Sequence, residues 1–194
     1  YGVDGLQAFV LKGFAGTGKT SIVSALVHTL PYMGLKPLLM APTGRAAKVL
    51  SSYSGHPAFT IHKMIYQSRA TADGHIVMAL QSNSFKKTVF IVDEASMIQT
   101  YQSSTASNQF SSVDILEDLF QYVFSGDDCK LLLIGDTAQL PPVGMSESPA
   151  LDMPYLKSSF SLNMGSFQLT EVVRQEMDSG ILINATSLRN KIST

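Results

Sequence analysis

The stretch "AFVLKGFAGTGKT", from Ala8 to Thr20, decides the fold of this chain. Residues 8–13 are mostly apolar and predict a buried strand, and residues 13–20 match the pattern G-x-x-x-x-G-K-[ST]. The glycines let successive backbone N–H groups turn inward around phosphate oxygens, and the following helix presents its positive end there. A chance glycine-rich turn is the alternative, but a complete match between a strand and a helix favours a phosphate-binding loop.

The residues of this loop have separate tasks in a nucleotide site. Lys19 places a positive charge near the β and γ phosphates, and Thr20 offers a hydroxyl to Mg²⁺. We therefore expect ATP and Mg²⁺ as cofactors. The residues assigned to nucleotide binding are Gly13, Ala15, Gly16, Thr17, Gly18, Lys19, Thr20 and Ser21.

An acidic pair follows a second apolar run, "TVFIVDEAS" (88–96). Asp93 is placed to join Thr20 in holding Mg²⁺, usually through water, and Glu94 to orient and deprotonate the attacking water. The alternative is that the two acids only cap the next helix, where negative charge is favourable. Beside a phosphate-binding loop, the pair is better interpreted as the second half of an ATP site.

Short, continuously apolar runs alternate with helical patterns along the chain. Runs of this kind, separated by helices, predict a mainly parallel sheet covered on both faces. The fold class is therefore α/β, a three-layer P-loop NTPase of the RecA-like kind occupying residues 1–194. Strands are expected at 8–13, 37–42, 88–96, 130–136 and 167–173, and helices at 19–30, 44–53, 61–66 (capped by Thr60), 112–124 (capped by Ser112) and from about Ser179.

Two stretches depart from this alternation. In residues 66–87, Asp73-Gly74 lies between two possible strands and predicts a small β-hairpin insert. Residues 99–112 are polar and rich in Ser, Thr and Gln, which predicts a mobile surface loop.

The composition limits the partners and the location. Of 194 residues, 45% are hydrophobic and 15% charged, with a formal net charge of −1, so any nucleic-acid site must be local. Cys129 is the single cysteine, which excludes an internal disulfide and fits a reducing cytoplasm.

No apolar run could span a membrane and no signal peptide is recognised, so we expect no membrane partner and a cytoplasmic location. The chain opens at Tyr1, which we interpret as a fragment of a longer protein.

Several classes of P-loop protein share the motifs described so far. The chain has no Asn-Lys-x-Asp sequence for guanine selection and no Leu-Ser-Gly-Gly-like signature of ABC ATPases. A P-loop kinase or phosphotransferase stays open as an alternative, although it needs an arginine-rich lid that the chain does not offer. A nucleic-acid-binding module with a vestigial ATP site would show damage at Lys19, Asp93 or Glu94, and all three are intact.

The remaining motifs lie at or just past the carboxyl ends of expected strands, where ligands bind in an open α/β sheet, except "TIHKMI", which lies on the connection after a strand. In order, "GFAGTGKT", "APTGRAAKVL", "TIHK", "VDEAS", "GDTAQLPPVG" and "LTEVVRQ" resemble the first motor domain of a superfamily-1 DNA helicase. The resemblance is to the RecD-like, Dda-like branch, which includes the alpha subunit of exodeoxyribonuclease V, and it extends over essentially the whole chain.

The resemblance implies catalytic roles for four residues. Gln139 would sense the γ-phosphate and link it to the DNA side, and Arg174 would reach the γ-phosphate, joining Lys19 and Glu94. A salt bridge from Arg174 to Glu171 or Glu176 is the alternative. Asp136 would lie at the Mg²⁺ edge, and Pro141-Pro142 would stiffen the exit loop.

The resemblance also implies that "APTGRAAKVL" and "TIHK" hold single-stranded DNA. Their hydroxyl, amide and imidazole groups suit phosphate and sugar contacts, and their basic side chains add positive charge. The alternatives are ordinary: a capping threonine, a half-buried histidine and a solvated basic face. The residues assigned to DNA binding are Pro42, Thr43, Gly44, Arg45, Thr60, His62 and Lys63, with Lys48 adding charge. Contacts to the phosphates and sugars of a nucleic acid discriminate poorly between DNA and RNA, so RNA is an alternative strand for this site.

Other parts of the family pattern concern the whole protein. The insert at 66–87 falls where this branch carries a strand-separating pin, for which Ile76 or Met78 would be the wedge, unless they pack against the main domain.

A second motor domain would follow Thr194, and an adenine-reading glutamine segment would precede residue 1. The resemblance implies 5′→3′ translocation with unwinding. We expect this piece alone to bind nucleotide weakly and not to unwind DNA, and membership in a nuclease complex stays open.

Overall fold

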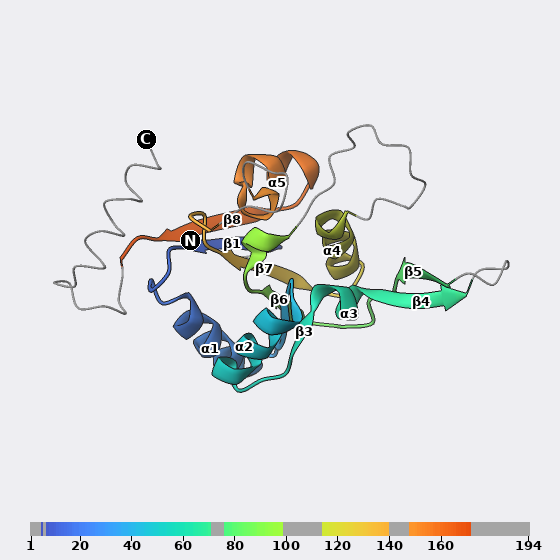
Figure 1. Ribbon diagram of the computed structural model, residues 1–194, viewed down its shortest axis with the longest axis horizontal. Helices are drawn as coiled ribbons and strands as arrows, with labels where there is room; N and C mark the ends of the chain where they lie inside the picture. The colour runs from blue at the N-terminus through green and yellow to red at the C-terminus, as the bar shows by residue number, and fades with distance from the viewer. Residues whose placement is uncertain (1–4, 6, 71–75, 99–113, 140–147, 172–194) are drawn as a thin grey trace.

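A parallel β-sheet forms the centre of the protein (Figure 1). The computed structural model describes residues 5, 7–70, 76–98, 114–139 and 148–171. Six described strands form the sheet in the order β3-β2-β6-β7-β1-β8, and every neighbouring pair is parallel. The strands are β1 (Ala8–Gly13), β2 (Lys36–Ala41), β3 (Ala58–Thr60), β6 (Thr88–Val92), β7 (Lys130–Gly135) and β8 (Met164–Leu169).

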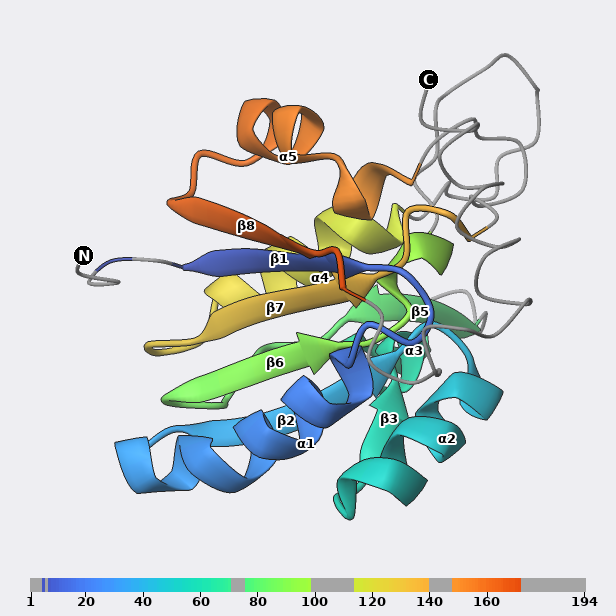
Figure 2. The same ribbon diagram turned by 90° about the vertical axis from the view of Figure 1, so that its left-hand side faces the viewer.

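Helices cover both faces of the sheet, as Figure 2 shows. On one face lie α1 (Lys19–Thr29), the 3₁₀ turn η1 (Leu30–Met33) and α2 (Gly44–Ser54). On the other lie α3 (Ile61–Ile65), α4 (Ile115–Phe124) and α5 (Met153–Ser159), with η2 (Ala95–Met97) and η3 (Pro149–Leu151). The predicted three-layer α/β fold is therefore confirmed.

Strand β6 shows why the central runs are continuously apolar. All five of its residues are buried. Phe90 and Val92 pack into the core beneath α4, whereas Val89 and Ile91 pack into the core beneath α1 and α2. Because successive side chains of a strand point to opposite faces, a strand covered by helices on both sides is apolar along nearly its whole length. The buried hydroxyl of Thr88, at the start of β6, donates to Lys86 O at 3.0 Å.

Local capping sets the helix starts, and one of our expectations was wrong. Helix α2 follows Thr43, whose Oγ1 accepts a hydrogen bond from Ala46 N at 3.2 Å, and α3 follows Thr60 in the same way. Helix α4 begins after Asp114, not Ser112, which lies outside the described residues. Asp114 Oδ1 accepts hydrogen bonds from Leu116 N and Glu117 N at 3.0 and 3.1 Å, so a carboxylate caps this helix.

The last strand is displaced from its expected position. We expected 167–173, but β8 runs from Met164 to Leu169 and pairs in register with β1, Ala8 beside Met164 and Gly13 beside Leu169. β8 lies at the edge of the described sheet, where only one of its six residues is buried, and its first half, Met-Gly-Ser, carries no continuous apolar signal. The short β3 and α5 were not predicted either. The helix expected from Ser179 and the loop expected at 99–112 lie outside the described residues.

A two-stranded hairpin extends away from the main sheet (Figure 1). It consists of β4 (Tyr66–Ala70) and β5 (Ile76–Leu80), which pair antiparallel and lie within the insert expected at 66–87. The Asp73-Gly74 turn lies outside the described residues. Tyr66 Oη donates to Asp118 Oδ2 on α4 at 2.5 Å, which fixes the base of the hairpin to the body of the domain.

No helix in the described part of the chain combines the length and the apolar character needed to span a membrane.

Candidate nucleotide and nucleic-acid site

The parallel arrangement brings several predicted site residues to one edge of the sheet. Strands β1, β6 and β7 lie side by side, with Val92 paired to Leu133 and Leu11 to Ile134. Their carboxyl ends therefore deliver the phosphate-binding loop, the Asp93-Glu94 pair and the segment from Asp136 to Gln139 to neighbouring positions. This is the edge where open α/β sheets bind ligands.

The phosphate-binding loop has the backbone that its glycines permit. Gly16 and Gly18 have φ values of 84° and 90°, in the left-handed region that favours glycine. Thr17 Oγ1 donates to Phe14 O at 2.8 Å and closes the turn. Lys19 Nζ donates to Gly13 O at 2.6 Å and to Phe14 O at 3.0 Å, so its ammonium lies over the loop where phosphate oxygens would be held.

Gly13 is required for a different reason, which is close packing. A Cβ at this position would lie 2.6 Å from Thr17 Oγ1 and 3.1 Å from Leu169 Cβ. The loop at Gly13 is thus closely packed against both Thr17 and strand β8. Of the other predicted nucleotide residues, Ala15 and Ser21 are exposed, and Thr20 is half-buried at the start of α1. Thr20 and Ser21 line an open groove along α1 that also includes Tyr53 of α2.

The acidic pair lies in a strained and partly buried turn. Glu94 has a φ of 55°, rare for a residue with a side chain, and its N–H donates to Asp93 Oδ1 at 2.9 Å. Asp93 Oδ2 accepts a hydrogen bond from Tyr53 Oη at 2.5 Å. Burial raises the pKa of Glu94, and the neighbouring Asp93 charge raises it further, while Gln139 and Lys19 act in the opposite direction. A carboxylate in this setting is suited to accept a proton from water.

Gln139 joins this acidic pair to the next turn of the chain. Its side chain hydrogen bonds to Glu94, and its Oε1 accepts a hydrogen bond from Ser96 Oγ at 3.2 Å. Asp136 is buried, and its Oδ1 accepts a hydrogen bond from Ala138 N at 2.9 Å, which shapes the turn that presents Gln139. The pair Pro141-Pro142, expected to stiffen this loop, lies outside the described residues.

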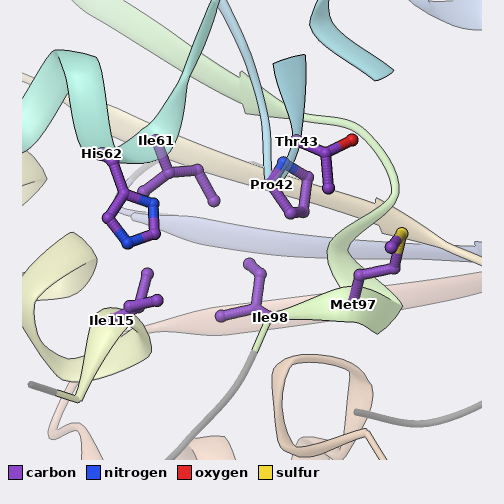
Figure 3. A pocket seen from close by; sticks show the side chains of 7 residues that line it. All are labelled: Pro42, Thr43, Ile61, His62, Met97, Ile98 and Ile115. Carbon is purple, nitrogen blue, oxygen red and sulfur yellow. The ribbon is translucent and has the colours of Figure 1, made fainter. Parts of the chain in front are cut away.

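A pocket of about 210 Å³ opens beside this edge (Figure 3). Pro42 and Thr43 reach it from the end of β2, and His62 reaches it from α3. Three of the predicted DNA-binding residues therefore share one pocket. Its remaining walls are apolar and come from α3, η2, the residue after η2, and α4: Ile61, Met97, Ile98 and Ile115.

Comparison with known proteins agrees with this geometry. The AAA_30 family, described as an AAA domain, matches residues 3–191. The chain belongs to this family. It is a RecA-like motor domain of the superfamily-1 helicase type, as the motif order indicated.

The motor domain is similar to longer helicases. It is 30% identical over 185 residues to the ATP-dependent RecD2 DNA helicase of Deinococcus radiodurans, covering 95% of this chain and 22% of that protein. It is 29% identical over 185 residues to the ATP-dependent DNA helicase dda of Enterobacteria phage T4, covering 93% and 37%. The chain thus spans well under half the length of either relative.

Two solved structures share the fold of the motor domain. The Pif1 helicase from Candida albicans matches with a TM-score of 0.56 at 21% identity, over 96% of this chain and 41% of that one. The Bacteroides Pif1 structure bound to single-stranded DNA matches with a TM-score of 0.51 at 21% identity, over 93% and 42%.

The other predicted DNA-binding residues of the motor domain lie outside the pocket walls. Gly44 and Arg45 are exposed at the start of α2, and Thr60 caps α3. Lys63 Nζ lies 5.9 Å from the centre of the Phe59 ring, over its face. Thr43 both caps α2 and lines the pocket, so its capping role leaves it in position to contact a ligand there. Arg174 lies outside the described residues.

Sequence reasoning missed two polar contacts of the motor domain. Ser96 was part of the quoted "VDEAS" motif, yet its bond to Gln139 joins residues 43 positions apart. Tyr53 looked like an ordinary α2 residue, and its bond to Asp93 spans 40 positions. Neither contact has a local pattern, because both depend on how separate strands and helices meet.

Proposed function

We propose that this chain is the ATP-binding and ATP-hydrolysing motor domain of a DNA helicase that translocates on single-stranded DNA, coupling hydrolysis to duplex unwinding. The observation that carries this proposal is the position of Gln139. Its side chain contacts Glu94 on the nucleotide side and Ser96 on η2. Met97, the next residue of η2, lines the pocket that holds three predicted DNA-binding residues.

We assign the nucleotide chemistry to residues that follow the carboxyl ends of β1 and β6. Lys19 and the backbone of the phosphate-binding loop bind the phosphates, and Glu94 orients and deprotonates the attacking water. The Thr20 hydroxyl, at the start of α1, and the Asp93 carboxylate, just after β6, are hard oxygen donors at the same edge of the sheet and fit Mg²⁺. Held by these two residues, the ion would supply positive charge that offsets the negative charge of the phosphates.

The pocket of Figure 3 supports the DNA assignment. Apolar walls from Ile61, Ile98 and Ile115 suit the face or edge of a base, while Thr43 and His62 offer hydrogen bonds to phosphate or sugar. With a net charge of −1, the chain has no overall attraction for nucleic acid, so such a local site is needed. Thr60, Arg45, Lys63 and Gly44 would extend the track beyond the pocket.

The hairpin of β4 and β5 is proposed as the strand-separating pin. It projects from the domain, and Met78, which pairs with Ser68 midway along the two strands, is 57% exposed. Its base is held by Tyr66 and Asp118. Polarity of 5′→3′ follows from the resemblance to the RecD-like branch alone.

Translocation requires a second motor domain that closes over ATP, because such motors move by opening and closing two domains on DNA. The relatives are longer helicases, of which this chain spans 22% and 37%. We propose that the second domain lies C-terminal to this chain, that Arg174 reaches the γ-phosphate, and that the protein works in the cytoplasm.

The test compares ATP hydrolysis by this chain and by the full-length protein, with and without single-stranded DNA. We expect weak nucleotide binding and slow hydrolysis for the chain alone, and DNA-stimulated hydrolysis with unwinding for the full-length protein. Robust unwinding by the chain alone would contradict the two-domain argument. DNA binding without any ATP binding would instead favour a nucleic-acid-binding module with a vestigial ATP site.

A further inference from the structure

The carboxylate of Asp93 is held at both of its oxygens. Oδ1 accepts the backbone N–H of Glu94 at 2.9 Å, and Oδ2 accepts the phenol of Tyr53 at 2.5 Å. The first contact belongs to the turn itself. The second comes from α2, a separate helix, and fixes the rotation of the carboxylate about its own axis.

Tyr53 is well placed to hold this orientation. It lies near the end of α2, which is anchored in the core by Ala47 and Leu50. Its side chain is half-buried and lines the same groove as Thr20, the other residue expected to face Mg²⁺. A phenol on an anchored helix has few torsions to adjust, so its hydroxyl stays near one position.

We propose that Tyr53 is a positioning residue of the Mg²⁺ site, where its hydroxyl orients the Asp93 carboxylate for the ion. This role rests on the proposed ATPase function. A hydrogen bond from a neutral hydroxyl to an ionised carboxylate is short and strong and leaves the charge of the ligand intact. Partners that orient a metal ligand in this way typically change metal affinity by about 10–100-fold when removed.

The experiment titrates Mg²⁺ into this chain and a fluorescent ATP analogue held at fixed concentration. Tyr53→Phe keeps the ring and removes only the hydroxyl. We expect the Mg²⁺ concentration at half-saturation to rise by about tenfold. Binding of the analogue in the presence of EDTA should be unchanged, because Lys19 and the loop remain intact. The matched control is Tyr32→Phe, whose side chain is 92% exposed on η1, and it should leave both titrations unchanged.

Three results would contradict this role. Equal Mg²⁺ requirements for Tyr53→Phe and the wild-type chain would show that the hydroxyl does not serve the metal. Equal losses with and without Mg²⁺ would assign Tyr53 to packing of the loop or the helix. Absence of Mg²⁺-dependent binding in the wild-type chain would overturn the proposed function itself, and this role with it.

Discussion

The Ser96 hydroxyl donates to Gln139 Oε1 at 3.2 Å, joining the turn after β6 to the loop after β7. Gln139 also contacts Glu94, so one amide touches both the expected catalytic base and the segment leading to the DNA pocket. Residues that bridge two sites in this way are candidates for carrying coupling between them, and the claim needs a direct test.

Replacing Gln139 with Ala should leave ATP binding in place and reduce DNA stimulation of hydrolysis in the full-length protein. The variant keeps the phosphate-binding loop but removes the side-chain amide that contacts both Glu94 and Ser96. Coupling free energies between sites commonly correspond to 5-fold or larger effects, so we expect a loss of at least about 5-fold. The measurement is the ATPase rate with and without single-stranded DNA.

Ser96→Ala provides the second arm of this test, because it removes the other partner of the same bond. If the bond carries the coupling, the double variant should lose little more than Gln139→Ala alone. Additive losses would mean that the two residues act independently.

Replacing Lys19 with Ala should abolish nucleotide binding while the domain stays folded. Hydrogen bonds to charged groups contribute about 1.5–3 kcal/mol, so affinity should fall at least tenfold. Binding is measured with a fluorescent ATP analogue, and folding by urea unfolding. Lys157→Ala, an exposed lysine on α5, is the control. Unchanged affinity in Lys19→Ala would rule out the phosphate-binding loop.

Replacing Gly13 with Ala should destabilise the domain by about 1–3 kcal/mol, the usual cost of overpacking. The new methyl would lie 2.6 Å from Thr17 Oγ1 and 3.1 Å from Leu169 Cβ. The matched control is Gly44→Ala, because a Cβ at Gly44 meets nothing within 4 Å. At the start of α2 that change should be neutral or stabilise by up to about 1 kcal/mol. The free energies of unfolding of both variants are measured by urea unfolding. Equal values for Gly13→Ala and Gly44→Ala would contradict the packing argument.

Replacing Tyr66 with Phe should loosen the base of the hairpin. The phenol donates to Asp118, and both its burial and this bond raise the pKa of Tyr66. Removing it leaves the carboxylate without this donor, so we expect a loss of about 1–3 kcal/mol in the free energy of unfolding. Hydrogen exchange of the β4 and β5 amides should also speed up. Tyr155→Phe on α5 serves as the control, and protection in the hairpin identical to the wild type would show that Asp118 does not anchor it.

Much of this architecture could be predicted from the sequence, because its signals are local. The glycine pattern before Lys19 and the apolar run before Asp93 each predict a strand with a functional end. Parallel pairing then brings those ends together without further information.

The remainder depends on contacts between distant segments. Tyr53 and Asp93 are 40 positions apart, and their hydrogen bond forms because α2 packs against β2 and β3, next to the end of β6. The start of β8 at Met164 is set by pairing with Ala8 and not by its own mostly exposed residues.

The most direct test of the central claim is ATP hydrolysis by the full-length protein, with and without single-stranded DNA, in the wild type and in Lys19→Ala. The account predicts hydrolysis that single-stranded DNA stimulates in the wild type and that Lys19→Ala abolishes. A wild-type rate indifferent to DNA, or DNA-stimulated hydrolysis that survives Lys19→Ala, would contradict it.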